Sequence, residues 1–326
     1  MINDKEFLKF EEGFFRPYFE KFIEFKRGKG EKVAQSTMIR LRKLNNSLNC
    51  YRAHHISSQM MEELLAPRDG LSESERQYMT SSLRQFCSFL ALLGVEAVDV
   101  PQKYMRAARC EFRPYIFSDI ELQRLASAAD TLPAARRSNV HQQVYPVLVR
   151  ILIGTGMRIG EVLALTRADV NPENGIINVI NGKNGVSRYI PVADSLKKVL
   201  QDYVKTIDMT EGNKPFFTSS YTGGHLTYSA MKYMFPKMFK AAGIYMADGQ
   251  TPNIHSIRHT FCTKSLGKML ECGMDVYTAI PILAAYVGHV NYMDTEKYIH
   301  FTEQGHENFV QKESSLGRLF PEVDNE

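Results

Sequence analysis

The chain has 326 residues, of which 44% are hydrophobic and 23% are charged, a composition typical of soluble globular proteins with room for two ordinary domains. Its net charge of +4 is too small to indicate a nucleic-acid partner by itself. The amino terminus lacks the basic start and apolar run of a signal peptide, and no apolar stretch is long enough to cross a membrane, so we expect a cytoplasmic protein.

Residues 1–110 predict a small bundle of helices. Apolar residues recur at spacings of three and four in four stretches: 14–26, 37–49, 57–65 and 72–93. The last stretch begins with Glu73 and Glu75, and acidic residues stabilise the first turn of a helix. We therefore expect an all-helical first domain.

Basic residues are concentrated between positions 26 and 52, a stretch with eight basic residues and a single acidic residue, Glu31. Such a surface can contact phosphates. A solvated helix face would look similar, and that alternative stays open. The predicted DNA-contacting residues are Lys26, Arg27, Lys29, Lys32, Arg40, Arg42 and Lys43.

Two prolines and several basic residues interrupt the helical pattern between 100 and 114, which predicts a linker between two domains, 1–110 and 111–326. Ser118 and Glu121 have the spacing of a capping box. A helix is therefore expected to open the second domain there.

Arg158 follows an apolar helical run at 147–153 and a glycine break at Gly154 and Gly156. We expect it at the start of a new helix, with Glu161 on the same face, where the carboxylate can hold the guanidinium. A guanidinium binds two phosphate oxygens at once and stays charged at any working pH. A surface ion pair is the alternative.

Lys183 lies at the predicted tip of a β-hairpin. Two β-rich stretches, 175–180 and 186–192, flank a segment in which Asn-Gly occurs twice, a strong hairpin signal. A lysine there can give a proton to the strongly basic 5′ oxygen that leaves when a DNA phosphodiester is cleaved. The alternative is a solvated charge at a hairpin tip.

His255 and Arg258 lie one turn apart on a predicted helix, so both can reach a single phosphate. We expect the adjacent His259 to be a structural histidine under the site. A helix then ends at Gly288, followed by His289 and, nine residues later, by Tyr298 near the start of another helix. A phenol with a pKa of about 10 becomes a nucleophile beside cations that favour its deprotonation.

In their order and spacing these elements resemble the tyrosine recombinase (phage integrase) family. Residues 155–161, TGMRIGE, match its first arginine box, and residues 255–259, HSIRH, match its second. Gly182-Lys183 matches the hairpin lysine, and VGH at 287–289 with Tyr298 completes the set. The resemblance covers roughly residues 113–300. It departs from compact members of the family at 263–282, which looks stretched and leaves the helix boundaries there open.

The resemblance implies a mainly α multidomain fold: a helical bundle (a SAM-like core-binding domain) and an α+β catalytic domain with a small antiparallel sheet. It implies DNA cleavage through a 3′-phosphotyrosine and a Holliday-junction intermediate, with neither a metal nor a nucleotide cofactor. The catalytic set that it carries over is Arg158, Lys183, His255, Arg258, His289 and the nucleophile Tyr298, with Glu161 in support.

The implied partner is double-stranded DNA with inverted-repeat core sites, bound by four protomers and belonging to a mobile element. An apolar pattern at 308–321 (Phe309, Leu316, Leu319, Phe320) lies after Tyr298, the last of the candidate catalytic residues. By the same resemblance it packs on a neighbouring protomer, and docking on its own domain is the alternative.

Three other functions fit parts of this pattern. A type IB topoisomerase shares the chemistry, and an inactive DNA-binding regulator could share the fold, although every reactive position is filled here. A metal-dependent nuclease could use the histidines, but no carboxylate cluster accompanies them. The five cysteines show no CxxC pair, which argues against a zinc site.

Overall fold

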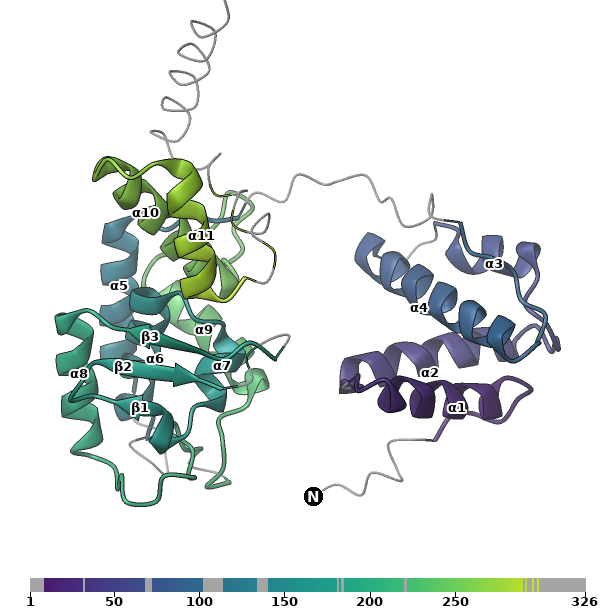
Figure 1. Cartoon of the computed structure of the whole chain (residues 1–326), viewed down its shortest axis with the longest axis horizontal. Helices are drawn as coiled ribbons and strands as arrows, with labels where there is room; N and C mark the ends of the chain where they lie inside the picture. The colour runs from purple at the N-terminus through teal and green to yellow at the C-terminus, as the bar shows by residue number, and fades with distance from the viewer. Residues whose placement is uncertain are drawn as a thin grey trace, which may run out of the picture. The chain divides into compact units, whose positions relative to one another are not determined.

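The protein is mainly helical, with one small antiparallel sheet, as the sequence predicts (Figure 1). The computed structural model describes residues 9–31, 33–67, 72–101, 114–133, 140–180, 182, 185–219, 222–289, 291, 295 and 298. The chain divides into two compact units, Met1–Phe112 and Arg113–Glu326. Each unit has its own hydrophobic core.

The first unit is a helical bundle. Its helices are α1 (Arg16–Gly28), α2 (Gln35–Asn49), α3 (Ser58–Leu65) and α4 (Glu73–Leu92). Each overlaps one of the four stretches that the apolar spacing predicts, although α1 continues to Gly28 and α2 begins at Gln35. The α4 helix packs on the other three, and the rings of Phe19 and Phe86 stack with centroids 3.8 Å apart at the centre of the core. Aromatic burial of this kind contributes strongly to the stability of a small domain.

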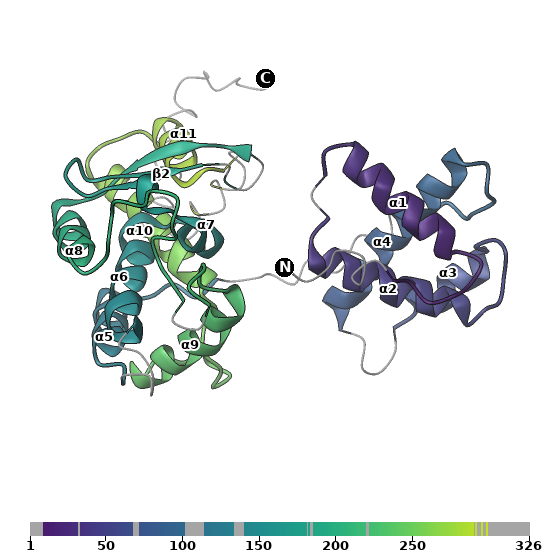
Figure 2. The ribbon, with the colours of Figure 1, turned by 90° about the horizontal axis from the view of Figure 1, so that it is seen from below.

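The second unit surrounds two central helices. Its helices are α5 (Asp119–Asp130), α6 (Val140–Thr155), α7 (Ile159–Ala164), α8 (Asp194–Val204), α9 (Tyr228–Ala241), α10 (His255–Glu271) and α11 (Val276–Val287), with a 3-10 turn at Arg167–Asp169. Figure 2 shows the sheet and α11 toward one side of this unit and α5 and α9 toward the other, with α6 and α10 between them. The α5 helix begins at the predicted capping box, where the Ser118 hydroxyl accepts a hydrogen bond from the Glu121 amide.

The sheet has the strand order β1 (Val170–Asn171), β2 (Ile176–Val179) and β3 (Arg188–Pro191), all antiparallel. The β2–β3 hairpin confirms the Asn-Gly signal, whereas the two-residue β1 is too short for the sequence pattern to reveal. Ile177 pairs with Ile190, and both are fully buried. Because side chains alternate along a strand, Arg188 faces the same interior side as Ile190.

Two glycines form the sharp turns next to the predicted site. Gly156 (φ +59°) follows α6, and Gly288 (φ +70°) ends α11, both in the left-handed region that other residues avoid. A Cβ at position 156 would lie 2.4 Å from Cδ1 of Phe261, and one at 288 would lie 2.7 Å from Nη1 of Arg188. Both turns therefore require glycine, for backbone conformation and for space.

The region at 263–282 is helical on both sides of a short break, since α10 continues to Glu271 and α11 begins at Val276. This assigns the helix boundaries that the sequence left open. No helix within the described residues is long and apolar enough to span a membrane.

Candidate active site

Arg158 is the residue just before α7, as predicted, and Glu161 holds it. Its Nη1 donates to Oε1 of Glu161 at 3.0 Å, and its backbone N–H donates to Oε2 of the same carboxylate at 3.1 Å. The Nη2 atom donates to the carbonyl of Gly288 at 3.0 Å, a contact between positions 130 residues apart. The first arginine box is thereby joined to the end of α11.

Arg258 is joined to the same place from α10. Its guanidinium is 2% exposed and donates to the carbonyls of Gly156 and Val287, each at 2.8 Å. Within the described part of the chain it forms no ion pair with a carboxylate, and its Nε is buried without a hydrogen-bond acceptor. Burial, followed by the nearby charge of Arg158, lowers the pKa of Arg258 to about 10, so the group is still a cation at neutral pH. A buried cation held by carbonyls alone is suited to receive an anion.

Arg188 is a third arginine at this junction, and the sequence analysis did not single it out. From β3 it donates through Nε to the carbonyl of Tyr286 at 2.8 Å, and through Nη1 and Nη2 to both oxygens of Glu161 at 3.2 and 2.9 Å. Three arginines from three elements thus bind the carbonyls of three consecutive residues at the end of α11. The alternation that puts Arg188 on the buried side of β3 is the signal that could have identified it.

Glu161 is the shared acid of this network, with a side chain that is 5% exposed. Burial alone would raise its pKa, but the hydrogen bonds and charge of Arg188, followed by those from Arg158, hold the pKa below its usual value of 4.5. The carboxylate is therefore ionised at neutral pH, and it fixes two guanidinium groups at once.

Tyr298, the predicted nucleophile, lies against the predicted structural histidine. The phenol is 1% exposed, and its oxygen is 2.8 Å from Nδ1 of His259, which is itself 5% exposed. The two rings are tilted, with centroids 5.7 Å apart. The sequence predicted a structural role for His259 beneath the site, and its direct contact with the Tyr298 hydroxyl is a feature that only the fold reveals.

The two predicted catalytic histidines lie on either side of this pair. His255 is exposed, and its ring meets that of His259 edge-on at a centroid distance of 4.7 Å. The ring of His289 is parallel to that of Tyr298, with centroids 6.4 Å apart, and its Nδ1 is 2.7 Å from Oγ1 of Thr295. The imidazoles predicted from separate motifs are thus gathered around one phenol.

Lys183 lies outside the described residues, but Gly182 before it is described. The Gly182 amide donates to the carbonyl of Val186 at 3.0 Å, and a Cβ on Gly182 would lie 3.2 Å from Oε1 of Glu161. The hairpin turn therefore begins beside the carboxylate that holds the arginines. The helix predicted from 293 and the apolar tail at 308–321 also lie outside the described residues, apart from Thr295 and Tyr298.

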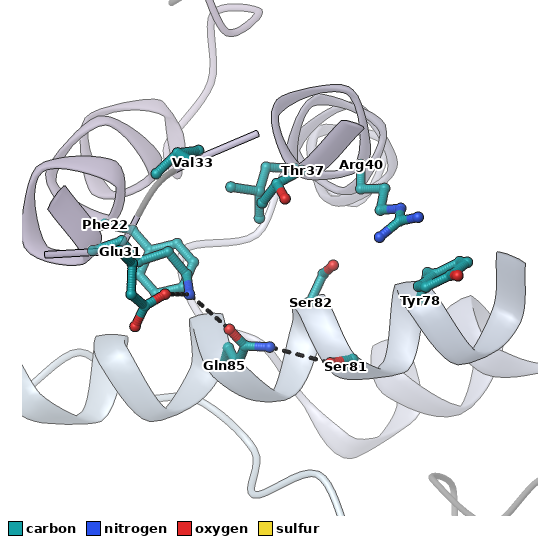
Figure 3. A pocket seen from close by; sticks show the side chains of 11 residues that line it. Phe22, Glu31, Val33, Thr37, Arg40, Tyr78, Ser81, Ser82 and Gln85 are labelled. Carbon is teal, nitrogen blue, oxygen red and sulfur yellow. Dashed lines mark hydrogen bonds and ion pairs between the residues drawn. The ribbon is translucent and has the colours of Figure 1, made fainter. Parts of the chain in front are cut away.

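In the first unit, two predicted DNA-contacting residues line a hollow between α1, α2 and α4 (Figure 3). Lys26 donates to Glu31 at 2.8 Å and to Gln85 at 2.9 Å, and the guanidinium of Arg40 lies 3.4 Å from the ring centroid of Tyr78. These contacts keep both cations at the edge of the hollow.

The other predicted contacts of this surface are partly satisfied inside the unit. Lys43 pairs with Glu75 of α4 at 3.5 Å, an acid that the local count of charges missed because it belongs to another helix. Lys29 lies 4.6 Å from the ring centroid of Phe25, and Arg27 is exposed. Arg42 is half-buried, and Lys32 lies outside the described residues.

The described residues contain no group of three or more histidine, cysteine, aspartate or glutamate side chains arranged to hold a metal ion. Cys50, Cys87, Cys262 and Cys272 take part in no disulfide bond.

Comparison with solved structures identifies the same fold. The chain aligns with the XerH site-specific recombinase bound to a palindromic difH substrate, at a TM-score of 0.65 with 17% identity, covering 85% of this chain and 80% of that one. It aligns with a lambda integrase dimer bound to a COC′ core site at a TM-score of 0.60 with 15% identity, covering 86% and 76% of the two chains.

Sequence relatives lead to the same group. The protein y4rB of Sinorhizobium fredii, whose name places it among integrases and recombinases, is 28% identical over 293 residues, covering 87% of this chain and 92% of its own. The tyrosine recombinase XerD of Rhizobium meliloti is 25% identical over 251 residues, covering 76% and 77%. Residues 117–304, more than half of the chain, match the phage integrase family as a whole. This protein therefore belongs to the phage integrase family, the family of tyrosine recombinases.

Proposed function

We propose that this protein is a site-specific DNA recombinase that cleaves and rejoins strands through a 3′-phosphotyrosine on Tyr298 and a Holliday junction. The observation that carries the proposal is the convergence of Arg158 and Arg258 on neighbouring carbonyls at the end of α11, with Tyr298 close enough to Arg258 to act on its charge. Two fixed guanidinium groups beside a buried phenol are what in-line attack on a phosphodiester requires.

In this proposal Arg158 and Arg258 bind the non-bridging oxygens of the scissile phosphate, where negative charge builds up in the transition state. The imidazoles of His255 and His289 donate further hydrogen bonds there. The Tyr298 oxygen bonds to phosphorus as the bond to the 5′ oxygen breaks, and Lys183 gives that oxygen a proton. Attack by a 5′-hydroxyl reverses the step and rejoins a strand.

The proposed substrate is double-stranded DNA with inverted-repeat core sites in a mobile element, bound by a tetramer with the first unit contacting the duplex. The basic residues Lys26, Arg27, Lys29 and Arg40 support that contact, together with Arg42, Lys43 and Lys32. Two similar proteins of known structure, XerH and lambda integrase, were solved with DNA. Exchange between two duplexes needs four protomers, and the apolar tail at 308–321 is the segment proposed to join them.

Filled reactive positions favour an active enzyme over an inactive regulator. A type IB topoisomerase would use the same chemistry to relax DNA, so strand exchange between two duplexes is the property that separates the two functions.

The test is covalent capture on a nicked suicide substrate. We expect an adduct between protein and DNA that survives denaturation in the presence of EDTA, because the nucleophile is a side chain. Tyr298→Phe should abolish the adduct and leave DNA binding intact. The matched control is Tyr286→Phe, which removes a phenol that donates to the Pro191 carbonyl in the same unit.

An adduct that persists in Tyr298→Phe would assign the nucleophile to another tyrosine, such as Tyr292. Cleavage that stops in EDTA and returns with magnesium would replace this proposal with a metal-dependent nuclease. Relaxation of supercoils without any exchange between sites would favour the topoisomerase.

A further inference from the structure

The contact between His259 and the Tyr298 oxygen has a chemical consequence. An imidazole nitrogen 2.8 Å from a phenol oxygen is within direct proton-transfer distance. Both side chains are almost fully buried, at 5% and 1% exposure, so the pair is largely shielded from bulk water. A phenol in such a place needs a neighbour to take its proton.

The other two histidines of the site are placed differently. His255 is exposed and reaches the ring of His259 with its own ring. The Nδ1 of His289 is engaged with Thr295, and its ring is stacked parallel to the phenol at 6.4 Å. These positions suit hydrogen bonds to a bound phosphate better than contact with the attacking oxygen.

We propose that His259 is the general base of strand cleavage and the general acid of rejoining, an inference that rests on the proposed function. In cleavage, the Tyr298 oxygen forms its bond to phosphorus, its proton passes to Nδ1 of His259, and the 5′ oxygen leaves with a proton from Lys183. In rejoining, the 5′-hydroxyl attacks phosphorus and gives its proton to Lys183, the bond from phosphorus to the Tyr298 oxygen breaks, and the His259 imidazolium protonates the departing phenolate. The role requires the tautomer that carries its proton on Nε2.

The charge of Arg258 acts on both members of this pair. As a neighbouring cation on α10, it favours the neutral imidazole that must accept the proton, and it stabilises the phenolate form of Tyr298. The charge of Tyr298 in turn raises the pKa of Arg258, so the two groups are close enough to interact. His255 from α10 and His289 after α11 face the pair. Cys262, Arg158 and Glu161 lie close enough to Arg258 to act on its charge.

The experiment is the pH dependence of single-turnover adduct formation by the full-length protein. We expect the wild-type rate to fall at acid pH, because a protonated His259 can no longer accept the proton of Tyr298. His259→Gln keeps a side chain of similar length but cannot accept the proton. We expect it to be slower by roughly 10²–10⁴-fold, with the acid limb of the profile lost. His225→Gln is the matched control, since that imidazole lies 2.8 Å from the backbone carbonyl of Leu163 and belongs to none of the predicted catalytic motifs.

Two chemical substitutions separate a base from a structural support. A fluorinated tyrosine at position 298 is more acidic and should restore much of the rate of His259→Gln, because a weaker base suffices. A substrate with sulfur in place of the leaving 5′ oxygen should rescue Lys183→Ala and leave His259→Gln slow, because only the acid has become dispensable.

The proposal is overturned if His259→Gln keeps the wild-type rate and acid limb, or if the limb disappears instead in His255→Gln or His289→Gln. An adduct still formed on Tyr298 in that case would leave the proposed function intact. Should His259→Gln fail to fold, fluorotyrosine in the otherwise wild-type chain decides. If the acid limb of its pH profile lies at the same pH as in the wild type, the result supports His259. If the limb shifts together with the pKa of the phenol, the result refutes the proposal.

Discussion

Arg258 in the second unit and the surface lysines of the first unit are held in different ways. In the second unit, Arg258 is buried and bound by two backbone carbonyls. In the first unit, Lys26 and Lys43 meet the carboxylates of Glu31 and Glu75 near the surface. Carbonyls fix the position of a guanidinium without cancelling its charge, whereas a carboxylate neutralises its partner. A carbonyl-held guanidinium therefore suits the binding of one phosphate at a defined point. Lysines paired with carboxylates suit a DNA backbone that can be contacted in several registers.

The largest effect should come from the carbonyl-held cation. Arg258→Lys keeps the charge, but an ammonium cannot reproduce the planar fork that reaches Gly156 and Val287. Adduct formation in single turnover should slow by roughly 10²–10³-fold, or about 2.7–4 kcal/mol of transition-state stabilisation. The control is Arg150→Lys, which alters a fork that grips Asp130 at 2.6 and 2.7 Å away from the site.

If Arg258→Lys cleaves at the wild-type rate, a positive charge at this position is sufficient for cleavage. The carbonyl-held guanidinium would then have no advantage over a lysine paired with a carboxylate. Equal losses in Arg258→Lys and Arg150→Lys would attribute the effect to packing of the unit.

A smaller effect, on stability, should follow from Arg188→Gln. Breaking a buried ion pair costs roughly 3–5 kcal/mol, and we expect about the lower limit because Glu161 keeps its contacts with Arg158. The chain has no tryptophan, so urea unfolding followed by far-UV circular dichroism is the measurement. Lys264→Gln, which removes an exposed pair with Asp119, should cost under about 1 kcal/mol.

The stability difference between the wild type and Arg188→Gln should also depend on pH. Arg188 is the main partner that holds the pKa of Glu161 below 4.5, so the stabilisation is present above that pH and is lost as the pH falls through the lowered pKa of the folded state. The stability gap between wild type and Arg188→Gln should therefore shrink on acidification below about 4.5. A gap that stays constant would mean that the pair contributes packing alone.

The smallest effect should come from the first unit. Arg40→Gln with Lys43→Gln should weaken binding to all duplexes alike and flatten the plot of log affinity against log salt by about 0.9 for each lost phosphate contact. Arg16→Gln is the control, since that residue is paired with Glu20 on α1. An unchanged slope would mean that this surface is solvated, and a loss restricted to one sequence would indicate base contacts.

Local patterns predicted most of the fold. Ser118 and Glu121 gave the start of α5, Asn-Gly gave the hairpin, and Gly288 gave the end of α11, because caps and turns depend on neighbours within a few residues. The order of the boxes predicted the two arginines that meet at the end of α11 and the histidines whose rings lie next to His259 and Tyr298.

The long-range partners could not be predicted in this way. Glu75 meets Lys43 across two helices, Arg188 reaches Glu161 from a different element, and His259 touches a phenol 39 positions away. Each contact depends on how elements pack, which periodicity does not specify. Of these contacts, only that of Arg188 has a signal in the sequence, since the alternation along β3 puts this charged residue on the buried side of the strand.

The junction at the end of α11 is recognised through main-chain atoms, since the three arginines bind the carbonyls of residues 286, 287 and 288. Every amino acid presents the same carbonyl, so this junction constrains the register of the chain more than the identity of its side chains. Exchange of Ala285 for another helix-forming residue leaves all three acceptors in place. Insertion of a single residue in the last turn would rotate them by about 100° around the helix axis, because an α-helix has 3.6 residues per turn. Apart from Gly288, whose conformation requires glycine, this junction is therefore expected to tolerate substitution but not a change of length.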